Sequence, residues 1–317
     1  MVEHILIFIA SGGLLFWAGG WLVKTLSRIA RFLGWREFVV AFFIMALATS
    51  VQNLFVGISS ILHKIPQLSF GDIVGANVLD LTLAIALAAL VARGLPAESR
   101  LIQNSVFFTI AIAVLPLILI LDGKLGRGDG IILILIFFFY IFWLFSKEER
   151  FKKVYDGQDS ALKIGLKTFV LDLAKIFLGI IFLLAAAEGI VRSALFFAEN
   201  LNMPIALVGT LIVALGTSLP ETYFAIASAR KKENWLILGD LMGSVIIVTT
   251  LILGIIALIS PIEILDFSPF AVARIFLIIS ALAFLVFLRT GQRITKKEAL
   301  FLLGIYIIFV ITEILTK

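Results

Sequence analysis

Five carboxylic acids stand inside strongly apolar stretches of the sequence, where they have the greatest capacity for chemistry. They are Asp72, Asp80, Glu188, Glu221 and Asp240. A carboxylate at the centre of a lone membrane span costs about 2.5 to 3.5 kcal/mol on insertion scales, so each needs a partner or a water-filled cavity. Carboxylate oxygens are also ligands for hard cations. Glu221 and Asp80 are deeply embedded and indicate a binding site, whereas Asp72 and Asp240 stand close to loops and also fit interfacial positions.

Glu221 ends a segment that combines oxygen ligands with an expected break in the backbone. The segment reads Gly-Thr-Ser-Leu-Pro-Glu at residues 216–221. Pro220 cannot donate the helical hydrogen bond and its ring opposes the preceding turn, so we expect the helix to break there. Freed carbonyl groups, the hydroxyls of Thr217 and Ser218 and the carboxylate then converge, which suits Na⁺ or Ca²⁺. The alternative is a proline kink in a packed helix.

A degraded copy of this segment occurs in the first half of the chain. A single offset superposes three separated segments, which is hard to obtain by chance from an apolar composition, so it predicts an internal repeat. The superposed pairs are Ala46 to Ser50 on Ala214 to Ser218, Gly71 and Asp72 on Gly239 and Asp240, Gly75 on Gly243, and Gly123 on Gly291. The copy keeps the hydroxyls of Thr49 and Ser50 but has Asn53 where the second half has Glu221. Asn53 still offers an oxygen ligand without a charge.

The elements that must position these residues are membrane-spanning helices. Hydrophobic residues make up 62% of the 317 residues and the mean hydropathy is +1.15, which exceeds what a soluble core requires. Apolar runs recur at close to the roughly 20 residues that cross a bilayer. We expect ten spans, at residues 4–26, 37–62, 68–92, 101–121, 130–146, 166–195, 203–229, 235–259, 269–288 and 298–315. The chain has no cysteine and only two histidines, which argues against thiolate chemistry and zinc.

Charge distribution predicts the topology. Basic residues concentrate in alternate loops, including 24–36, 147–167, 230–232 and 289–297, which the positive-inside rule places in the cytoplasm, with both termini outside. The net charge of +5 therefore needs no nucleic-acid partner. Since five spans per copy is an odd number, the two copies must be inverted. We predict a first repeat at 1–146, a cytoplasmic linker at 147–165 and a second repeat at 166–317.

These motifs resemble those of the calcium/cation antiporter superfamily, which includes the sodium/calcium exchangers, over essentially the full chain. The resemblance implies two inverted five-helix repeats and an ion cluster between spans 2, 3, 7 and 8. It maps the paired motif carboxylates to Asn53 and Glu221, and a further polar pair to Asp80 and Val248. The other ligands that it implies are the hydroxyls of Thr49, Ser50, Thr217, Ser218 and Ser244 and the backbone carbonyls of Ala46 and Ala214. Asp72 and Asp240 stand where the family commonly has a neutral polar residue, so they add charge near the pathway or face a vestibule.

The function that these residues predict is antiport in a cell membrane. The expected exchange is Ca²⁺, or a similar hard cation, for Na⁺ or H⁺ at one midplane site, with no other cofactor. Asn53, Ala76 and Val248 depart from the family pattern and change the charge count; with Glu221 and Asp80 as the only site carboxylates, near-electroneutral exchange is expected. Two alternatives remain open from sequence: an intramembrane hydrolase that uses Asp72 and Asp240 as a dyad, and a transport-inactive membrane subunit.

Overall fold

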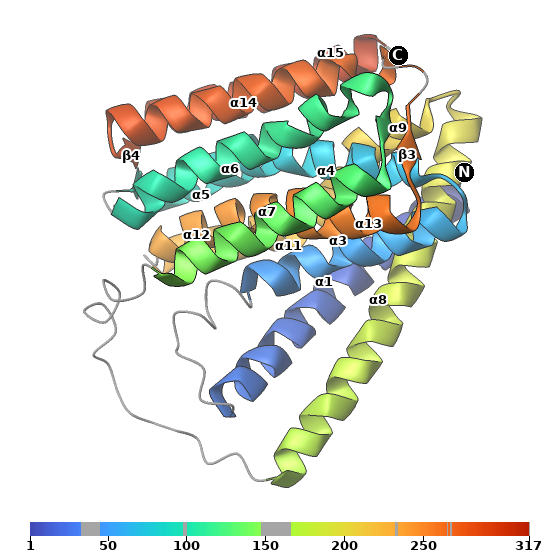
Figure 1. The fold of residues 1–317 in the computed structure, drawn as a ribbon, viewed down its shortest axis with the longest axis horizontal. Coiled ribbons are helices and arrows are strands. Elements are labelled where there is room, and N and C mark those ends of the chain that lie inside the picture. Colours follow the sequence, from blue (N-terminus) through green and yellow to red (C-terminus); the bar gives the residue numbers. More distant parts are fainter. Residues whose placement is uncertain are drawn as a thin grey trace.

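The computed structural model describes residues 1–32, 45–97, 100–146, 166–231, 234–264, 266 and 268–316, and these residues are mainly helical (Figure 1). The helical elements are α1 (Val2–Phe32), α3 (Met45–Leu62), α4 (Pro66–Leu79), η2 (Asp80–Ala84), α5 (Ile85–Ala92), α6 (Arg100–Leu119), η3 (Ile120–Asp122), α7 (Arg127–Ser146), α8 (Leu166–Asn200), α9 (Ile205–Val208), η5 (Gly209–Val213), α10 (Ala214–Thr217), α11 (Leu219–Arg230), α12 (Asn234–Ile247), η6 (Val248–Ile252), α13 (Leu253–Ile259), η7 (Ser268–Phe270), α14 (Ala271–Thr290) and α15 (Lys296–Leu315). The strands are β1 (Leu95–Pro96), β2 (Lys124–Leu125), β3 (Ile262–Glu263) and β4 (Arg293–Ile294).

Eight helical segments of the described chain are long and apolar enough to cross a membrane. They are Pro66–Ala92, Ile102–Asp122, Arg127–Leu144, Ala174–Asn200, Ile205–Arg230, Ile237–Ile259, Ser268–Thr290 and Lys296–Leu315. Two shorter apolar helices, Val2–Ala18 and Thr49–Leu62, fall within the first two predicted spans. Residues 37–44 of the second predicted span lie outside the described residues. Large apolar side chains such as Phe142 and Phe177 are exposed on the outer surface, as expected of a protein whose solvent is lipid.

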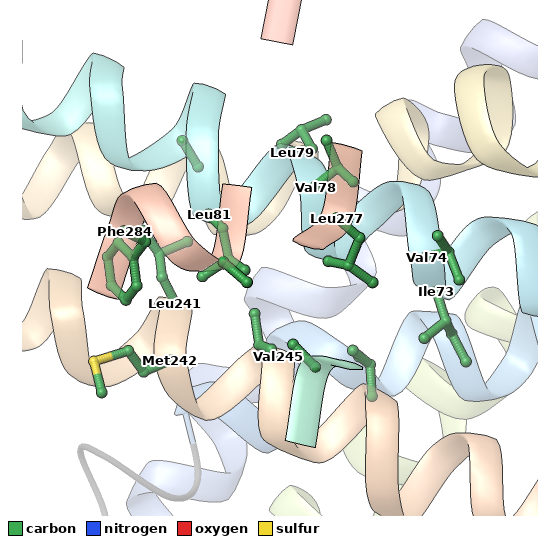
Figure 2. Packing of buried hydrophobic residues seen from close by; sticks show 14 of the residues in the cluster. Ile73, Val74, Val78, Leu79, Leu81, Leu241, Met242, Val245, Leu277 and Phe284 are labelled. Atoms are coloured by element: carbon green, nitrogen blue, oxygen red, sulfur yellow. The ribbon is translucent and has the colours of Figure 1, made fainter. Parts of the chain in front are cut away.

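The helices pack around two separate hydrophobic clusters. The larger cluster lies between α4, α12 and α14, and Figure 2 shows Val74, Val245 and Leu277 among its members. The second cluster joins α1 and α8 to α3, with Leu15 and Ala187 at its centre. In Figure 1, α1 and α8 lie together and slant away from the remaining helices. The α1 and α8 pair therefore packs largely as a unit of its own against the larger bundle.

Three helices change pitch inside the bundle. Single-turn π-helical segments occur at η2, η5 and η6. Val248, the first residue of η6, is the repeat counterpart of Asp80, the first residue of η2, so this irregularity recurs at the offset of the sequence repeat. Such π segments often mark functional sites.

The helix break expected at Pro220 is present, two residues earlier. Ser218, at φ −87° and ψ 2°, separates α10 from α11. Pro220 falls in the first turn of α11, where a missing N–H costs nothing, so the interruption moves to the residue before that turn. The first-half counterpart, α3, runs without interruption through Gln52, whose Nε2 donates to the carbonyl of Thr49 at 2.7 Å.

Two short antiparallel strand pairs connect the first half of the chain to the second half. β1 pairs with β4, with Leu95 opposite Ile294, and β2 pairs with β3, with Lys124 opposite Glu263. β1 and β3 precede α6 and α14 respectively, while β2 and β4 precede α7 and α15. Each pair therefore takes one strand from each half of the chain, and the two pairs are equivalent to one another.

Glycines allow α4 to lie against α9 and η5 at backbone distance. A Cβ on Gly75 would overlap the carbonyl of Thr210 and lie 2.8 Å from the Cβ of Ala214. Gly71 and Gly209 would meet the carbonyls of Ala206 and Leu68 in the same way. The overlapping atoms belong to the backbone, so no side-chain rotation can relieve these contacts.

Gly75→Ala is therefore expected to lower stability by about 1 to 3 kcal/mol, because overpacking outweighs the roughly 1 kcal/mol gained in helix propensity. The measurement is the thermal unfolding midpoint of the purified protein in detergent. Gly304→Ala provides the control, since nothing lies within 4 Å of a Cβ at that position of α15. A midpoint for Gly75→Ala equal to or above that of Gly304→Ala would contradict the close packing.

Candidate functional site

Four of the five acids selected from the sequence as candidate site residues are fully buried. The exposed fractions of Asp72, Asp80, Glu221 and Asp240 are 0%, 1%, 1% and 3%. Asp72 and Asp240 lie within α4 and α12, and their side chains are buried against neighbouring helices rather than exposed at helix ends. These acids come from helices that are distant in sequence.

Asp72 has a partner on each of its oxygens. Thr217 donates through Oγ1 to Oδ1 at 2.7 Å, and Asn53 donates through Nδ2 to Oδ2 at 3.1 Å. These bonds join α4 to α10 and α3. The sequence paired Asn53 with Glu221 through the repeat, whereas the hydrogen bond of Asn53 in the structure is to Asp72. Asp72 thus fixes the orientation of the Asn53 side-chain amide. An ionised carboxylate can accept hydrogen bonds but cannot donate them, so the NH₂ group of Asn53, and not its oxygen, must point at Asp72.

A chain of hydroxyls leads to Glu221. Ser50 donates through Oγ to Ser244 at 3.0 Å, and Ser244 donates to Oε1 of Glu221 at 3.4 Å. The three residues come from α3, α12 and α11. The hydroxyl of Ser218 lies beside Asp80, at the start of the π-helical segment. The structure therefore brings Ser50, Ser218, Ser244 and Glu221 to one region.

The carboxylates of Asp80, Glu221 and Asp240 lie within electrostatic reach of one another. Oδ1 of Asp80, Oε2 of Glu221 and both carboxylate oxygens of Asp240 are buried without a hydrogen-bond partner among the described residues. The hydroxyl of Thr49 lies beside Asp240.

No buried basic side chain in the described ranges balances the charge of these acids. The buried polar side chains of the described chain include no lysine or arginine. Unpaired charges are expensive to bury, so the acids require cations or protons to neutralise them. In the described part of the chain no three acidic or histidine side chains stand close enough to hold one metal ion by themselves. Hydroxyl, amide and carbonyl oxygens must therefore complete any ligand set.

The contacts of the site repeat across the two halves. Thr217 lies on Asp72, and Thr49, its counterpart in the first half, lies beside Asp240. The carbonyls of Ala46 and Ala214 accept from Thr49 at 3.2 Å and from Thr217 at 3.3 Å. The carbonyl of Ala214 also accepts from the backbone N of Ser218 at 3.0 Å, so both of its lone pairs have partners.

The sequence interpretation missed a polar pair beside this cluster. Asn77 donates through Nδ2 to Oγ1 of Thr249 at 2.8 Å, between α4 and η6. Its Oδ1 is buried without a partner in the described chain. The available signal was a buried amide one residue after Ala76, inside an otherwise apolar helix.

Glu188 belongs to a different cluster. It accepts from Ser59 at 2.7 Å and from Arg192 at 2.7 Å, and it contacts Nε2 of His63 at 2.9 Å. These bonds join α8 to the end of α3, outside the group of buried acids. Its charge is compensated by neighbours that the other four acids lack.

Comparison with known proteins decides the family. The family model described as sodium/calcium exchanger protein matches residues 3–146 and 172–315. The chain belongs to this family. The chain is 27% identical to the inner membrane protein YrbG of Escherichia coli, over 91% of this chain and 90% of that protein. It is also 27% identical to the sodium/calcium exchanger MaX1 of Methanosarcina acetivorans, over 94% and 95% of the two chains.

The fold of the chain also resembles that of experimentally solved structures. Structures of the sodium-calcium exchanger NCX_Mj superpose with a TM-score of 0.68 at 23% sequence identity, covering 98% of both chains. Together with the apolar helices, these matches show a polytopic, all-helical membrane protein of an antiporter family. Members of this family are transporters, so the hydrolase interpretation of Asp72 and Asp240 is wrong.

Proposed function

We propose that this protein is a secondary antiporter that exchanges Ca²⁺, or a similar hard cation, for Na⁺ or H⁺. The observation that carries the proposal is the group of buried acids Asp80, Glu221 and Asp240, whose unpartnered oxygens face no buried lysine or arginine among the described residues. Hard oxygen ligands of this kind suit Na⁺ and Ca²⁺. Ser50, Ser218, Ser244 and the carbonyls of Ala46 and Ala214 supply neutral ligands around them, and Asn53 adds an amide oxygen. The name of the relative MaX1 supports the choice of ions.

The proposal includes ten spans arranged as two inverted repeats, at 1–146 and 166–317. The recurrence of η2 in η6, the two equivalent strand pairs and the two separate family matches support it. Five spans per repeat, with basic loops in the cytoplasm, place both termini outside the cell. The linker at 147–165 lies outside the described residues.

Alternating access would then come from movement of α1 and α8 against the bundle. The two helices share their own hydrophobic cluster, and Gly189 of α8 packs directly on the Oγ of Ser11 of α1. Discrete packing units can shift while their interiors stay intact. The bundle would hold the acids in place as the pair exposes them to one side and then to the other.

The test of this function is ⁴⁵Ca²⁺ uptake into proteoliposomes under imposed Na⁺ or pH gradients. We expect uptake against the Ca²⁺ gradient when one of these gradients is directed outward, and none when both are collapsed. Protein-free liposomes give the baseline. Failure of every imposed gradient to drive Ca²⁺ or Sr²⁺, with folded protein in the membrane, would favour the transport-inactive subunit instead.

The expectation of near-electroneutral exchange assumed that Glu221 and Asp80 were the only carboxylates of the site. Asp240 is buried beside them, which adds a third negative charge. Both oxygens of Asp72 accept hydrogen bonds, so the count takes the three carboxylates that have oxygens without a described partner. Three monovalent cations neutralise these three, whereas one Ca²⁺ leaves one negative charge. We therefore expect one net charge to move per cycle, worth about 2.3 kcal/mol per 100 mV, or roughly fifty-fold in the sustained gradient. The measurement is the equilibrium Ca²⁺ gradient with the potential clamped by K⁺ and valinomycin. A gradient independent of potential would restore the two-carboxylate count.

A further inference from the structure

An open apolar groove lies between α14 and α15, away from the buried acids. Its volume is about 430 Å³, within the range of ligand-binding clefts. Its lining residues are Leu282, Ala283, Val286, Phe287, Lys297, Glu298 and Phe301. Leu282, Val286 and Phe301 are exposed, so the groove opens on the outer surface of the bundle. The two helices lie side by side and are joined through the hairpin that contains β4 (Figure 1).

One end of the groove carries unbalanced positive charge. Lys296 and Lys297 are exposed, and neither forms an ion pair within the described part of the chain. The one acid in the lining, Glu298, is engaged locally: its Oε2 accepts from the backbone N and the Oγ1 of Thr295, both at 2.7 Å. This capping box holds the Glu298 carboxylate against the start of α15, and the two lysines outnumber it by one positive charge.

We propose that this groove binds one anionic phospholipid. An acyl chain would lie along Val286 and Phe301, with the phosphate at the ammonium groups of Lys297 and Lys296. In the topology proposed above the hairpin faces the cytoplasm, where anionic lipids give the leaflet a negative surface potential. A lysine at the end of a span extends its ammonium group to the headgroups while its stem covers apolar surface.

The equivalent hairpin of the first half carries less positive charge, because an acid stands where α15 has Lys297. The repeat offset places Asp129 at the position of Lys297, and Oδ2 of Asp129 accepts from the backbone N of Gly126 at 2.8 Å. A carboxylate at this place repels a phosphate. Of the two hairpins, only the one between α14 and α15 should therefore prefer an anionic lipid.

Lipid binding is measured directly, by native mass spectrometry of the delipidated protein in nonionic detergent. Phosphatidylglycerol and phosphatidylcholine with identical chains are titrated separately. We expect tighter binding of phosphatidylglycerol, and we expect Lys297→Gln to weaken it about fivefold while leaving phosphatidylcholine unchanged. Val286→Trp fills the groove and should weaken both lipids. Arg127→Gln, which removes one positive charge from the equivalent hairpin, is the matched control and should bind as the parent does.

Equal affinity of the parent for the two lipids would overturn the proposal. So would an equal loss in Lys297→Gln and Arg127→Gln, which would indicate general attraction to a basic surface. Phosphatidylglycerol binding that survives Val286→Trp would place the lipid elsewhere. The substituted side chains are exposed, and the thermal unfolding midpoint of each variant verifies its fold. None of these readouts depends on transport.

Discussion

Glu221→Gln should abolish gradient-driven Ca²⁺ uptake and leave the protein folded. Glutamine has the shape of glutamate, and its amide oxygen can still accept the hydrogen bond from Ser244. What disappears is the charge on Oε2, which has no hydrogen-bond partner among the described residues and faces Asp80 and Asp240. With a cation bound, Glu221 and the cation form a buried ion pair, and removing one partner of such a pair costs about 3 to 5 kcal/mol, or more than a hundredfold in cation affinity. The measurement is ⁴⁵Ca²⁺ uptake at equal amounts of reconstituted protein.

Glu313→Gln is the matched control for this experiment. Glu313 is also a buried carboxylate in a predicted span, with 2% of its surface exposed, but it lies near the end of α15. The same change there should leave uptake at the parental rate. Parental uptake by Glu221→Gln would rule out Glu221 as a ligand, and equal loss in both variants would mean that any buried acid is required for folding or insertion.

Asn53→Asp should change the cation dependence of transport rather than merely reduce its rate. Nδ2 of Asn53 now donates to Oδ2 of Asp72 at 3.1 Å, so the substitution exchanges a donor for a second carboxylate at the same distance. Two buried carboxylates this close cannot both remain ionised without a cation or proton between them. We expect at least a tenfold shift in the Ca²⁺ concentration that gives half-maximal uptake, and a steeper pH profile.

The control for this variant is Asn53→Ala. Alanine removes the donor to Asp72 without adding a carboxylate. The pH profile of Asn53→Ala should therefore not steepen as that of Asn53→Asp does. If Asn53→Asp kept the parental Ca²⁺ dependence and pH profile, the bond between Asn53 and Asp72 would have no part in ion selection.

The sequence predicted which residues would be buried better than which would touch. Glu221 and Asp80 stand in long apolar runs, and that alone required burial. The bond between Asn53 and Asp72 was not foreseeable, because a register between repeats relates equivalent positions and says nothing about which faces of α3 and α4 meet. The same offset did predict that any contact such as Thr217 on Asp72 would have a counterpart.

Helix breaks and changes of pitch could be predicted from the sequence only where a particular residue type, such as proline, causes them. Pro220 marked a break, and the break lies at Ser218 because proline fits the first turn of the helix that follows. The π-helical segments had no such marker, since Asp80 to Ala84 read as ordinary helix. The groove between α14 and α15 likewise depends on how two helices pack, while the lysine at its end was visible in the sequence.

The two strand pairs, each formed between the two halves of the chain, suggest how such a chain arose. Each pair draws one strand from before residue 147 and one from after residue 165. A chain holding a single half would expose unpaired strand edges, which are templates for association with another copy. A half-length ancestor could have satisfied them only by pairing with a second molecule of itself. Duplication and fusion would turn that dimer contact into an intramolecular one, formed at a fixed effective concentration.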